Sequence, residues 1–542
     1  MNPVWSAVRR LPPPARGPRR WSSLPPHDSG AAARRTLWTV SVAAAITTMD
    51  ITIVNVALAA IAADLSATLP QLQWTVNAYP LLFAALLLVG GSLSDRLGRR
   101  RIFVAGVLLF TTGSLLCGVA PDPGVLVAGR AVQGVGGALL LAPSLPLLAE
   151  AYPGQRRNAA MGVFSATAAV SAAIAPLVGG ALVASLGWRS IFLVNLLPGA
   201  FVLFGALRWL PATGPRPARR LDVAGAALGV LLLGSVNLAV ISGGDDGWAR
   251  PVTLAAASVG ILALVLFVIT ERRVADPMLQ LALFRIRAFT GVSVLSFLTR
   301  AVGFGTMPYL VLWLQGMLGY SPLQAGLQLS ALSAAIVVGS LVVARLQHRH
   351  GTRAVVVAGF TAMCVGYLLV TRVTADSTWL VVLPGLLLIG TGMGLLFAPL
   401  MGISVSVVPS QQAGMASGTA NAFFPLGTAV GAAVFGAVLA SRVGAKLSDG
   451  VVISTGAPAQ IAPSVRELTS AGRFADLPPS VVDAARAAFA GGLAAVAGVA
   501  AAAAAVGVVV ALVTIPPRGE VPEPAVRRAP TSVRAEEADA DD

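Results

Sequence analysis

The stretch from Gly91 to Arg101, read Gly-Ser-Leu-Ser-Asp-Arg-Leu-Gly-Arg-Arg-Arg, constrains this chain more than any other. It places one acid, four arginines and two glycines in eleven residues, between two long apolar runs. Hydrocarbon cannot hold such a charge cluster, so we expect a tight turn on the water side of a membrane. The apolar runs before and after the turn are then expected to cross the bilayer.

Composition supports this interpretation. The 542 residues are 56% apolar and only 11% charged, and their mean hydropathy is +0.80. A soluble globular protein of this length carries more charge, so we expect an integral membrane protein with the lipid bilayer as a partner. The net charge of +15 falls mainly at the ends of apolar runs, so no nucleic-acid partner is expected.

The sequence offers few residues for bond-making chemistry. Cys117 and Cys364 both fall inside apolar runs, which does not indicate a disulfide framework. The three histidines, His27, His348 and His350, have no usable metal-ligand spacing. Neither paired carboxylates nor a nucleophile with a base is apparent, so we expect no enzyme, no metal site and no cofactor other than a coupling ion.

Apolar runs of about 20 residues, the length that crosses about 30 Å of hydrocarbon, recur along the chain. The fourteen expected spans are 36–58, 74–94, 102–120, 125–149, 159–184, 190–210, 222–242, 251–270, 289–313, 323–345, 354–373, 379–407, 416–441 and 488–515. Residues 1–35 and 516–542, which are rich in proline and charge, are expected to be disordered tails.

Basic residues predict the orientation. The short loops on the side of Arg96 hold seventeen arginines, whereas the opposite side holds eight basic residues even when the longer loop 442–487 is included. The positive-inside rule then places Arg96 and both termini in the cytoplasm of a multi-pass protein of the cell membrane.

An internal repeat predicts two related halves. The segment from Gly134 to Pro143 recurs from Gly390 to Pro399, and a degraded copy of the opening turn lies at residues 345–353. We therefore expect an all-α membrane fold of two six-helix bundles, residues 36–210 and 289–515, with two inserted helices in residues 211–288.

Three motifs connect the chain to a known family. The opening turn, with Gly91, Asp95, Arg96, Gly98 and Arg99–Arg101, resembles the signature loop between helices 2 and 3 of the major facilitator superfamily. Residues 126–136 resemble the proton-linked motif of helix 4, and residues 50–58 resemble the helix-1 motif of drug:proton antiporters. With fourteen spans, the chain is similar to the fourteen-helix drug:proton antiporters over about residues 36 to 515.

One motif departs from that pattern. The antiporter motif of helix 5 reads Gly-x-x-x-Gly-Pro-x-x-Gly-Gly, and here Ser171 and Ala175 replace its first two glycines before Pro176, Gly179 and Gly180. Small residues still permit close helix packing, but the direction of transport loses part of its support. The residues expected to pack helices in these motifs are Gln133, Gly134, Gly136, Pro176, Gly179 and Gly180.

Asp50 and Arg130 are expected to lie at similar depth in the first and fourth spans. An unpaired charge at that depth costs several kcal/mol, so both should face the protein interior, paired with each other or lining a wet cavity. One interpretation is a fixed salt bridge that joins the two helices. In the other, Asp50 takes up and releases the coupling proton while Arg130 tunes its proton affinity.

The resemblance gives the opening turn a second role as a conformational latch, formed by Gly91, Asp95, Arg96, Gly98, Arg99 and Arg100. The glycines permit a tight reversal and the arginines satisfy the positive-inside rule. The Asp95 carboxylate is expected against the N-terminal end of the thirteenth span, near Ala416 and Ser417, when the cytoplasmic side is closed. His348 occupies the equivalent position of the second half, where a neutral imidazole provides no such anion.

The substrate cavity is expected between the two halves, near the middle of the membrane. Polarity suggests Asn55, Asn77, Tyr79, Arg300, Trp313, Gln315 and Asn421 as wall residues. For Arg300 three roles remain open: a partner for Asp50 across the halves, a contact for an anionic group of the substrate, or a structural arginine.

The resulting hypothesis is a monomeric secondary active transporter that exports small amphipathic drugs or antibiotics in exchange for protons. Glycine-rich segments such as Gly134-Val-Gly136 lie in apolar spans and follow no strand, so no nucleotide is expected as a partner. The alternatives are a proton-coupled carrier of a specific metabolite or lipid, and a membrane sensor on the same fold that does not transport.

Overall fold

The computed structural model describes residues 29–152, 156–211, 222–245, 247–274, 277, 279, 281–407, 413–455 and 463–517. These residues form helices joined by turns, with no strand among them. Thirteen helices are long and apolar enough to cross a membrane, and α2 (Leu69–Leu97), which bends by 53° after Leu87, makes a fourteenth. The prediction of an all-helical membrane protein with fourteen spans is confirmed.

The first bundle contains six spans, two of which are broken into pairs of helices: α4 with α5, and α7 with α8. Its helices are α1 (Ser29–Asp64), α2, α3 (Arg99–Gly118), α4 (Pro123–Leu141), α5 (Ser144–Ala151), α6 (Arg156–Leu186), α7 (Ser190–Leu193) and α8 (Leu196–Arg208). The inserted pair is α9 (Val223–Asp245) and α10 (Pro251–Arg273).

The second bundle is preceded by the short helix η2, and its spans run from α11 to α18. Its elements are η2 (Leu281–Arg285), α11 (Arg287–Gly305), α12 (Met307–Leu312), η3 (Trp313–Met317), α13 (Pro322–His350), α14 (Thr352–Val370), η4 (Trp379–Val381), α15 (Leu383–Ser406), α16 (Ala413–Thr455), α17 (Pro463–Ser470), η6 (Phe474–Asp476) and α18 (Pro479–Thr514). The helix that follows α10 therefore opens the second copy of the repeat.

Matching helix ends show that the two bundles are copies. Thr68 begins α2 with a capping box, in which its N–H donates to Gln71 Oε1 at 3.0 Å and its hydroxyl accepts from the Gln71 N–H at 3.4 Å. Ser321 and Gln324, 253 residues later, form the same box at the start of α13, with distances of 2.9 and 3.2 Å. Each box satisfies backbone groups that a helix end leaves unpaired.

The turns that follow these helices match as well. Gly98, between α2 and α3, has φ +98°, and Gly351, between α13 and α14, has φ +84°. Because residues with a side chain rarely adopt this conformation, glycine permits the abrupt reversal at both places. The predicted pair of six-helix bundles with two inserted helices is confirmed.

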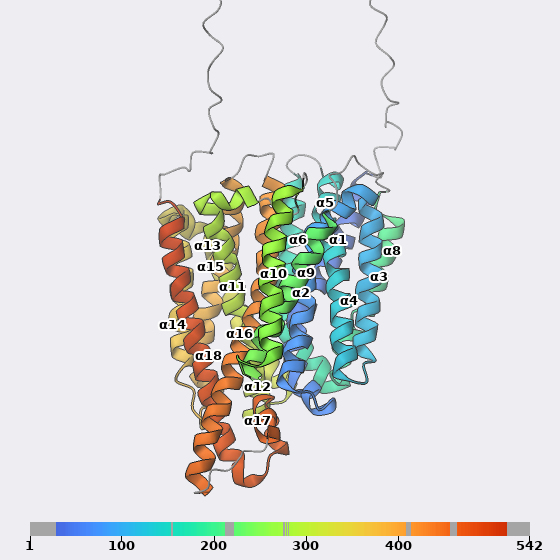
Figure 1. Cartoon of the computed structure of the whole chain (residues 1–542). Helices are drawn as coiled ribbons and strands as arrows, with labels where there is room; N and C mark the ends of the chain where they lie inside the picture. Colours follow the sequence, from blue (N-terminus) through green and yellow to red (C-terminus); the bar gives the residue numbers. More distant parts are fainter. Residues whose placement is uncertain are drawn as a thin grey trace, which may run out of the picture.

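Two boundaries differ from the expected ones. Residues 29–35, expected in the N-terminal tail, form the first turns of α1, because alanine and arginine favour a helix. The expected loop 442–487 is largely helical: α16 continues to Thr455, α17 follows, and α18 begins at Pro479. These segments project beyond the other helices at the bottom of Figure 1.

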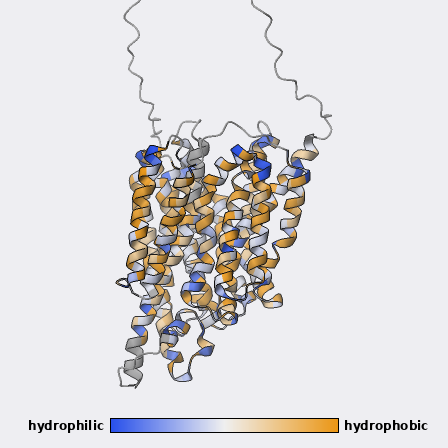
Figure 2. Cartoon of the chain, turned by 45° about the vertical axis from the view of Figure 1, so that its right-hand side comes forward, coloured by the Kyte–Doolittle hydropathy of each residue, from blue (hydrophilic) through white to orange (hydrophobic). Residues whose placement is uncertain are grey.

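The two ends of the bundle differ in charge and in packing. We call the end that carries the Gly98 turn the arginine-rich end, and the other the α17 end; they lie at the top and bottom of Figure 1. Hydrophilic residues gather toward both ends in Figure 2, while hydrophobic residues predominate along the helices between them.

The bundles contact each other closely near the α17 end. A Cβ added at Gly180 of α6 would lie 2.5 Å from the carbonyl oxygen of Pro322, and one at Gly326 of α13 would lie 2.3 Å from that of Pro176. Gln315 Nε2 also donates to the carbonyl of Val56 at 2.7 Å. Backbone groups of the two halves therefore touch on this side of the membrane.

The packing differs at the arginine-rich end, where three glycines have no close neighbour. A Cβ added at Gly91, Gly162 or Gly402 would meet no atom within 4 Å. These glycines lie near the arginine-rich ends of α2, α6 and α15. The buried cluster shared by the two bundles includes Leu58 and Trp188 of the first bundle, near the α17 end, whereas Val40 and Phe103, near the arginine-rich end, belong to a separate cluster of the first bundle. The two bundles are therefore held together at the α17 end.

Candidate functional site

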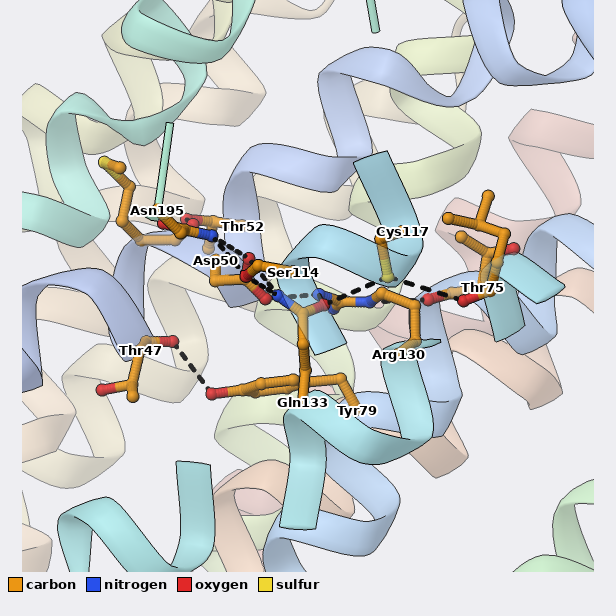
Figure 3. Close-up of polar contacts among 12 residues, drawn as sticks. Thr47, Asp50, Thr52, Thr75, Tyr79, Ser114, Cys117, Arg130, Gln133 and Asn195 are labelled. Carbon is orange, nitrogen blue, oxygen red and sulfur yellow. Dashed lines mark hydrogen bonds and ion pairs between the residues drawn. The ribbon is translucent and has the colours of Figure 1, made fainter. Parts of the chain in front are cut away.

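Asp50 lies in the middle of α1 and Arg130 in α4, and the structure joins them as an ion pair. Both side chains have an exposed fraction of 0%. Taking two ions out of water costs several kcal/mol each, so the pair requires further hydrogen bonds around it. Neighbouring helices provide them (Figure 3).

Three nitrogen donors surround the Asp50 carboxylate. Its Oδ1 accepts from Gln133 Nε2 at 3.1 Å and from Asn195 Nδ2 at 2.8 Å, and its Oδ2 accepts from Arg130 Nη1. The donors come from α4 and from the junction between α7 and α8. Among the described residues, the hydrogen bonds to the carboxylate therefore come from groups of its own bundle.

Arg130 is fixed on several sides. Its Nε donates to the Thr75 carbonyl at 3.1 Å, and its Nη1 donates to Gln133 Oε1 at 3.0 Å. Its Cζ lies 4.7 Å from the centre of the Tyr79 ring and 5.9 Å from that of Phe192. Within the described residues Nη2 has no hydrogen-bond partner, so one donor remains for another arrangement of the network.

Gln133 reaches the carboxylate because α3 and α4 approach closely. It lies one turn after Arg130 on the same face of α4, and a Cβ added at Gly113 of α3 would lie only 2.7 Å from its side chain. Gln133 Nε2 also donates to Ser114 Oγ at 2.7 Å. Glycine at position 113 thus makes room for the amide beside Asp50.

The chemistry available to this cluster is proton binding. Its only ionisable members are one carboxylate, one arginine, the Tyr79 phenol and the Cys117 thiol, and Cys117 is itself buried beside Gln133 Oε1 at 3.5 Å. Among the described residues, no group of three or more His, Cys, Asp or Glu side chains is arranged to hold a metal ion. Asp50 provides the carboxylate of this cluster, a group that can bind and release a proton.

The opening turn forms a second cluster at the arginine-rich end. Arg99 bonds to Asp95 one turn earlier, at 3.3 Å, and to Glu150 of α5, at 2.6 Å, while Arg100 Nη2 donates to the Leu207 carbonyl. The Asp95 side chain is 47% exposed. The turn therefore ties α2 and α3 to α5 and α8, with Asp95 accessible at its edge.

Comparison with known proteins identifies the family of this chain. The model of the Major Facilitator Superfamily matches residues 40–271 and 292–463, which include Asp50, Asp95 and Arg130. The chain belongs to the major facilitator superfamily. The predicted family and the predicted class of membrane transporter are confirmed.

Individual members of the superfamily resemble the chain over most of its length. The multidrug resistance protein Stp of Mycobacterium tuberculosis is 37% identical over 401 residues, 74% of each chain. The methylenomycin A resistance protein of Streptomyces coelicolor is 36% identical over 395 residues, 73% of this chain and 83% of that protein. A bacterial homologue of the human lysosomal transporter Spinster has the same fold, with a TM-score of 0.62 and 16% identity over 89% of this chain and 97% of its own.

The expected packing residues of this superfamily member lie at close helix contacts. A Cβ at Gly134 would lie 2.5 Å from the Tyr79 carbonyl oxygen, and one at Gly136 would lie 2.3 Å from the Phe110 backbone nitrogen. A Cβ at Gly179 would lie 2.7 Å from Ile53 of α1. With Gly180 against α13, these positions set the spacing of α4 and α6 from their neighbours.

The residues expected to line the cavity do not share one environment. Tyr79 lies inside the first bundle, where its hydroxyl donates to the Thr47 carbonyl at 3.2 Å. Asn55, Asn77 and Trp313 are buried, and each has a polar side-chain atom without a hydrogen-bond partner among the described residues.

The other three expected wall residues also separate. Gln315 joins the two bundles through the Val56 carbonyl. Arg300 lies in the second bundle. The side chain of Asn421 lies outside the described residues, so its expected place in the cavity stays a prediction.

The sequence interpretation missed Asn195 and Ser114, both of which belong to the Asp50 network. Each is a polar residue in an apolar run, but many such residues bond only to their own helix, so position alone did not distinguish them.

We expect Asn195→Leu to lower the free energy of unfolding in detergent by about 1.5–3 kcal/mol, because a buried carboxylate oxygen loses a donor. Asn237→Leu is the matched control, since Asn237 donates only to the Leu233 carbonyl of its own helix; equal losses would contradict the assignment.

Proposed function

We propose that this superfamily member exports small amphipathic drugs or antibiotics by alternating access and takes up protons in exchange. Stp is named for multidrug resistance, and the Streptomyces coelicolor relative for resistance to methylenomycin A. Both cover about three quarters of this chain at more than a third identity. The family model covers the segments that hold the buried ion pair, which supports a related function.

Asp50 is the residue that we assign to proton coupling. Among the acidic residues that the structure describes, it is the only one in the middle third of a membrane-spanning helix. An ionised group at that depth is expensive and usually functional. This position is the single observation that carries the proposal of proton coupling.

Proton exchange at Asp50 requires the network to rearrange. In the structure the carboxylate is fully buried and accepts three hydrogen bonds, so a proton reaches it only when α1 moves relative to α4 or to the junction of α7 and α8. Protonation removes the attraction to Arg130 and favours a different packing of these helices. Proton binding and conformation are coupled in this way.

The proposed orientation places the arginine-rich end in the cytoplasm and the protein in the cell membrane. The excess of arginines on that side supports this orientation. With the bundles in contact at the α17 end, the structure corresponds to a state closed to the outside. Export then requires the outer contacts to open while the arginine-rich ends approach each other.

Reconstituted vesicles test the proposal. With an acidic lumen, protons leaving through the protein should drive ethidium into the vesicles, and added ethidium should in turn raise the luminal pH reported by a trapped dye. A protonophore should abolish both signals. Ethidium movement without a pH change would favour an uncoupled carrier, and no movement of any drug-like cation or anion would favour the sensor.

The latch predicts an asymmetry between the two copies of the opening turn. We expect Asp95→Ala to abolish export and His348→Ala to leave it nearly unchanged, because only a carboxylate stabilises the free N–H groups at the start of α16, which begins at Ala413. Initial export rates in vesicles, normalised to folded protein, measure the effect. If the two substitutions reduce export equally, the latch is not asymmetric.

A further inference from the structure

Arg300 lies deep in the second bundle, on α11, and three phenylalanine rings surround its guanidinium. Its Cζ lies 4.6 Å from the ring centre of Phe304, 4.9 Å from that of Phe397 on α15 and 5.6 Å from that of Phe424 on α16. Rings at these distances attract a cation through their faces. They do not accept its N–H hydrogen bonds as a carboxylate does.

No acidic side chain of its own bundle is placed to pair with Arg300. From residue 277 to residue 448 the sequence contains one acid, Asp376, which lies in the loop before η4 at the α17 end. Arg300 Nε is buried and has no hydrogen-bond partner within the described part of the chain. Within the described part of the second bundle, Arg300 is therefore a deep positive charge that makes no ion pair.

Asp50 does not fill this role. It is enclosed in the first bundle by Arg130, Gln133 and Asn195, and its exposed fraction is 0%. To pair with Arg300 across the two bundles, Asp50 would have to lose its hydrogen bonds from these three donors. Among the described acids, neither Asp50 nor Asp376 is placed to pair with Arg300, which leaves room for an anion from outside the chain.

Arg300 lies on the side of α11 that faces α15 and α16. α11 packs against α18 through Gly291, where an added Cβ would lie 2.0 Å from Thr514. The rings that contact Arg300 belong to α15 and α16 as well as to α11, and α16 also packs against α2 of the first bundle. The guanidinium thus lies on the side of α11 away from α18.

We propose that Arg300 binds the carboxylate of an amphipathic aromatic substrate. This inference rests on the proposed export function and adds aromatic carboxylates to the cations, such as ethidium, that the vesicle test uses. The rings attract the guanidinium but accept none of its N–H hydrogen bonds, so its N–H groups can bind the two oxygens of a carboxylate. The same rings provide an apolar surface for the aromatic body of the substrate.

A pair of probes that differ only in charge tests this assignment. 1-Pyrenebutyrate carries an ionised carboxylate at pH 7, whereas its methyl ester is neutral. We expect the purified full chain to bind the acid at least about tenfold more tightly than the ester, and Arg300→Gln to remove this difference by weakening only the acid. Arg287→Gln, which removes an exposed arginine from the same helix, is the matched control and should leave both affinities unchanged.

A second variant separates ligand binding from a structural role. Arg300→Met removes an uncompensated buried charge and keeps an apolar side chain, so we expect it to raise the melting temperature of the ligand-free protein while it lowers affinity for the acid. A lower melting temperature with equal loss of both probes would mean that Arg300 only supports the fold. Unchanged binding of the acid in Arg300→Gln would also overturn the proposal.

The binding measurement does not depend on transport. If Asp50→Asn vesicles retain coupling but the purified protein distinguishes acid from ester through Arg300, the proposed proton site fails and the anion site stands. If coupling depends on Asp50 but Arg300→Gln binds both probes as before, the anion site fails alone.

Discussion

Asp50→Asn is expected to reduce proton-driven export to the background of protein-free vesicles. Asparagine cannot ionise. The Asp50 carboxylate accepts hydrogen bonds from Arg130, Gln133 and Asn195, whereas the amide of asparagine would turn an N–H donor toward at least one of these donors. The variant therefore cannot bind the coupling proton, and it also disturbs the hydrogen-bond network around position 50. Accumulation of ethidium under an imposed pH gradient measures the loss.

Two further measurements make this prediction decisive. Exchange of ethidium between the two sides without a pH gradient should persist, which would show that the variant is folded and still alternates. Asp64→Asn is the matched control, because Asp64 ends α1 with a 48% exposed side chain that pairs with Arg189, and it should export normally. Coupled export by Asp50→Asn would instead support the fixed salt bridge between α1 and α4.

Gly326→Val is expected to reduce export at least about tenfold by preventing closure at the α17 end. Even a Cβ at this position would lie 2.3 Å from the Pro176 carbonyl oxygen, and the contact is between backbone segments that cannot turn aside. Overpacking costs about 1–3 kcal/mol, and each 1.4 kcal/mol shifts an equilibrium about tenfold. Initial export rates, normalised to folded protein, measure the effect.

The matched control for this substitution lies on α6. Gly162 has the same residue type in a helix of the same interface, but a Cβ there meets no atom within 4 Å, so Gly162→Val should export at nearly the normal rate. If Gly326→Val exported normally, the outer contact between α6 and α13 would not be needed for transport. Equal loss in both variants would indicate a general effect of valine on these helices.

The spans, the repeat and the Asp50–Arg130 pair could be predicted because each depends on a large energy. Charges in hydrocarbon are so costly that apolar length defines the spans, and a deep acid and a deep arginine at similar depth are expected either to pair or to line a wet cavity. The glycines at 98 and 351 are recognisable because few other residues permit the reversal.

The remaining features depend on which side chains meet in three dimensions. Asn195 donates to Asp50 from 145 residues away, and nothing in its own segment indicates that partner. The rings around Arg300 come from three helices whose relative rotation the sequence does not show. The helical projection at the α17 end was missed because no hydrocarbon constrains a segment outside the bilayer.

The projection formed by α16, α17 and α18 gives the second bundle a lever outside the membrane. α16 has 43 residues, or about 65 Å at 1.5 Å per residue, which is roughly twice the hydrocarbon thickness. Because the helix is continuous, a rotation of the bundle in the bilayer displaces its outer tip farther than any point inside. A fluorophore or antibody fragment attached near η6 would therefore follow the transport cycle in real time from the aqueous side.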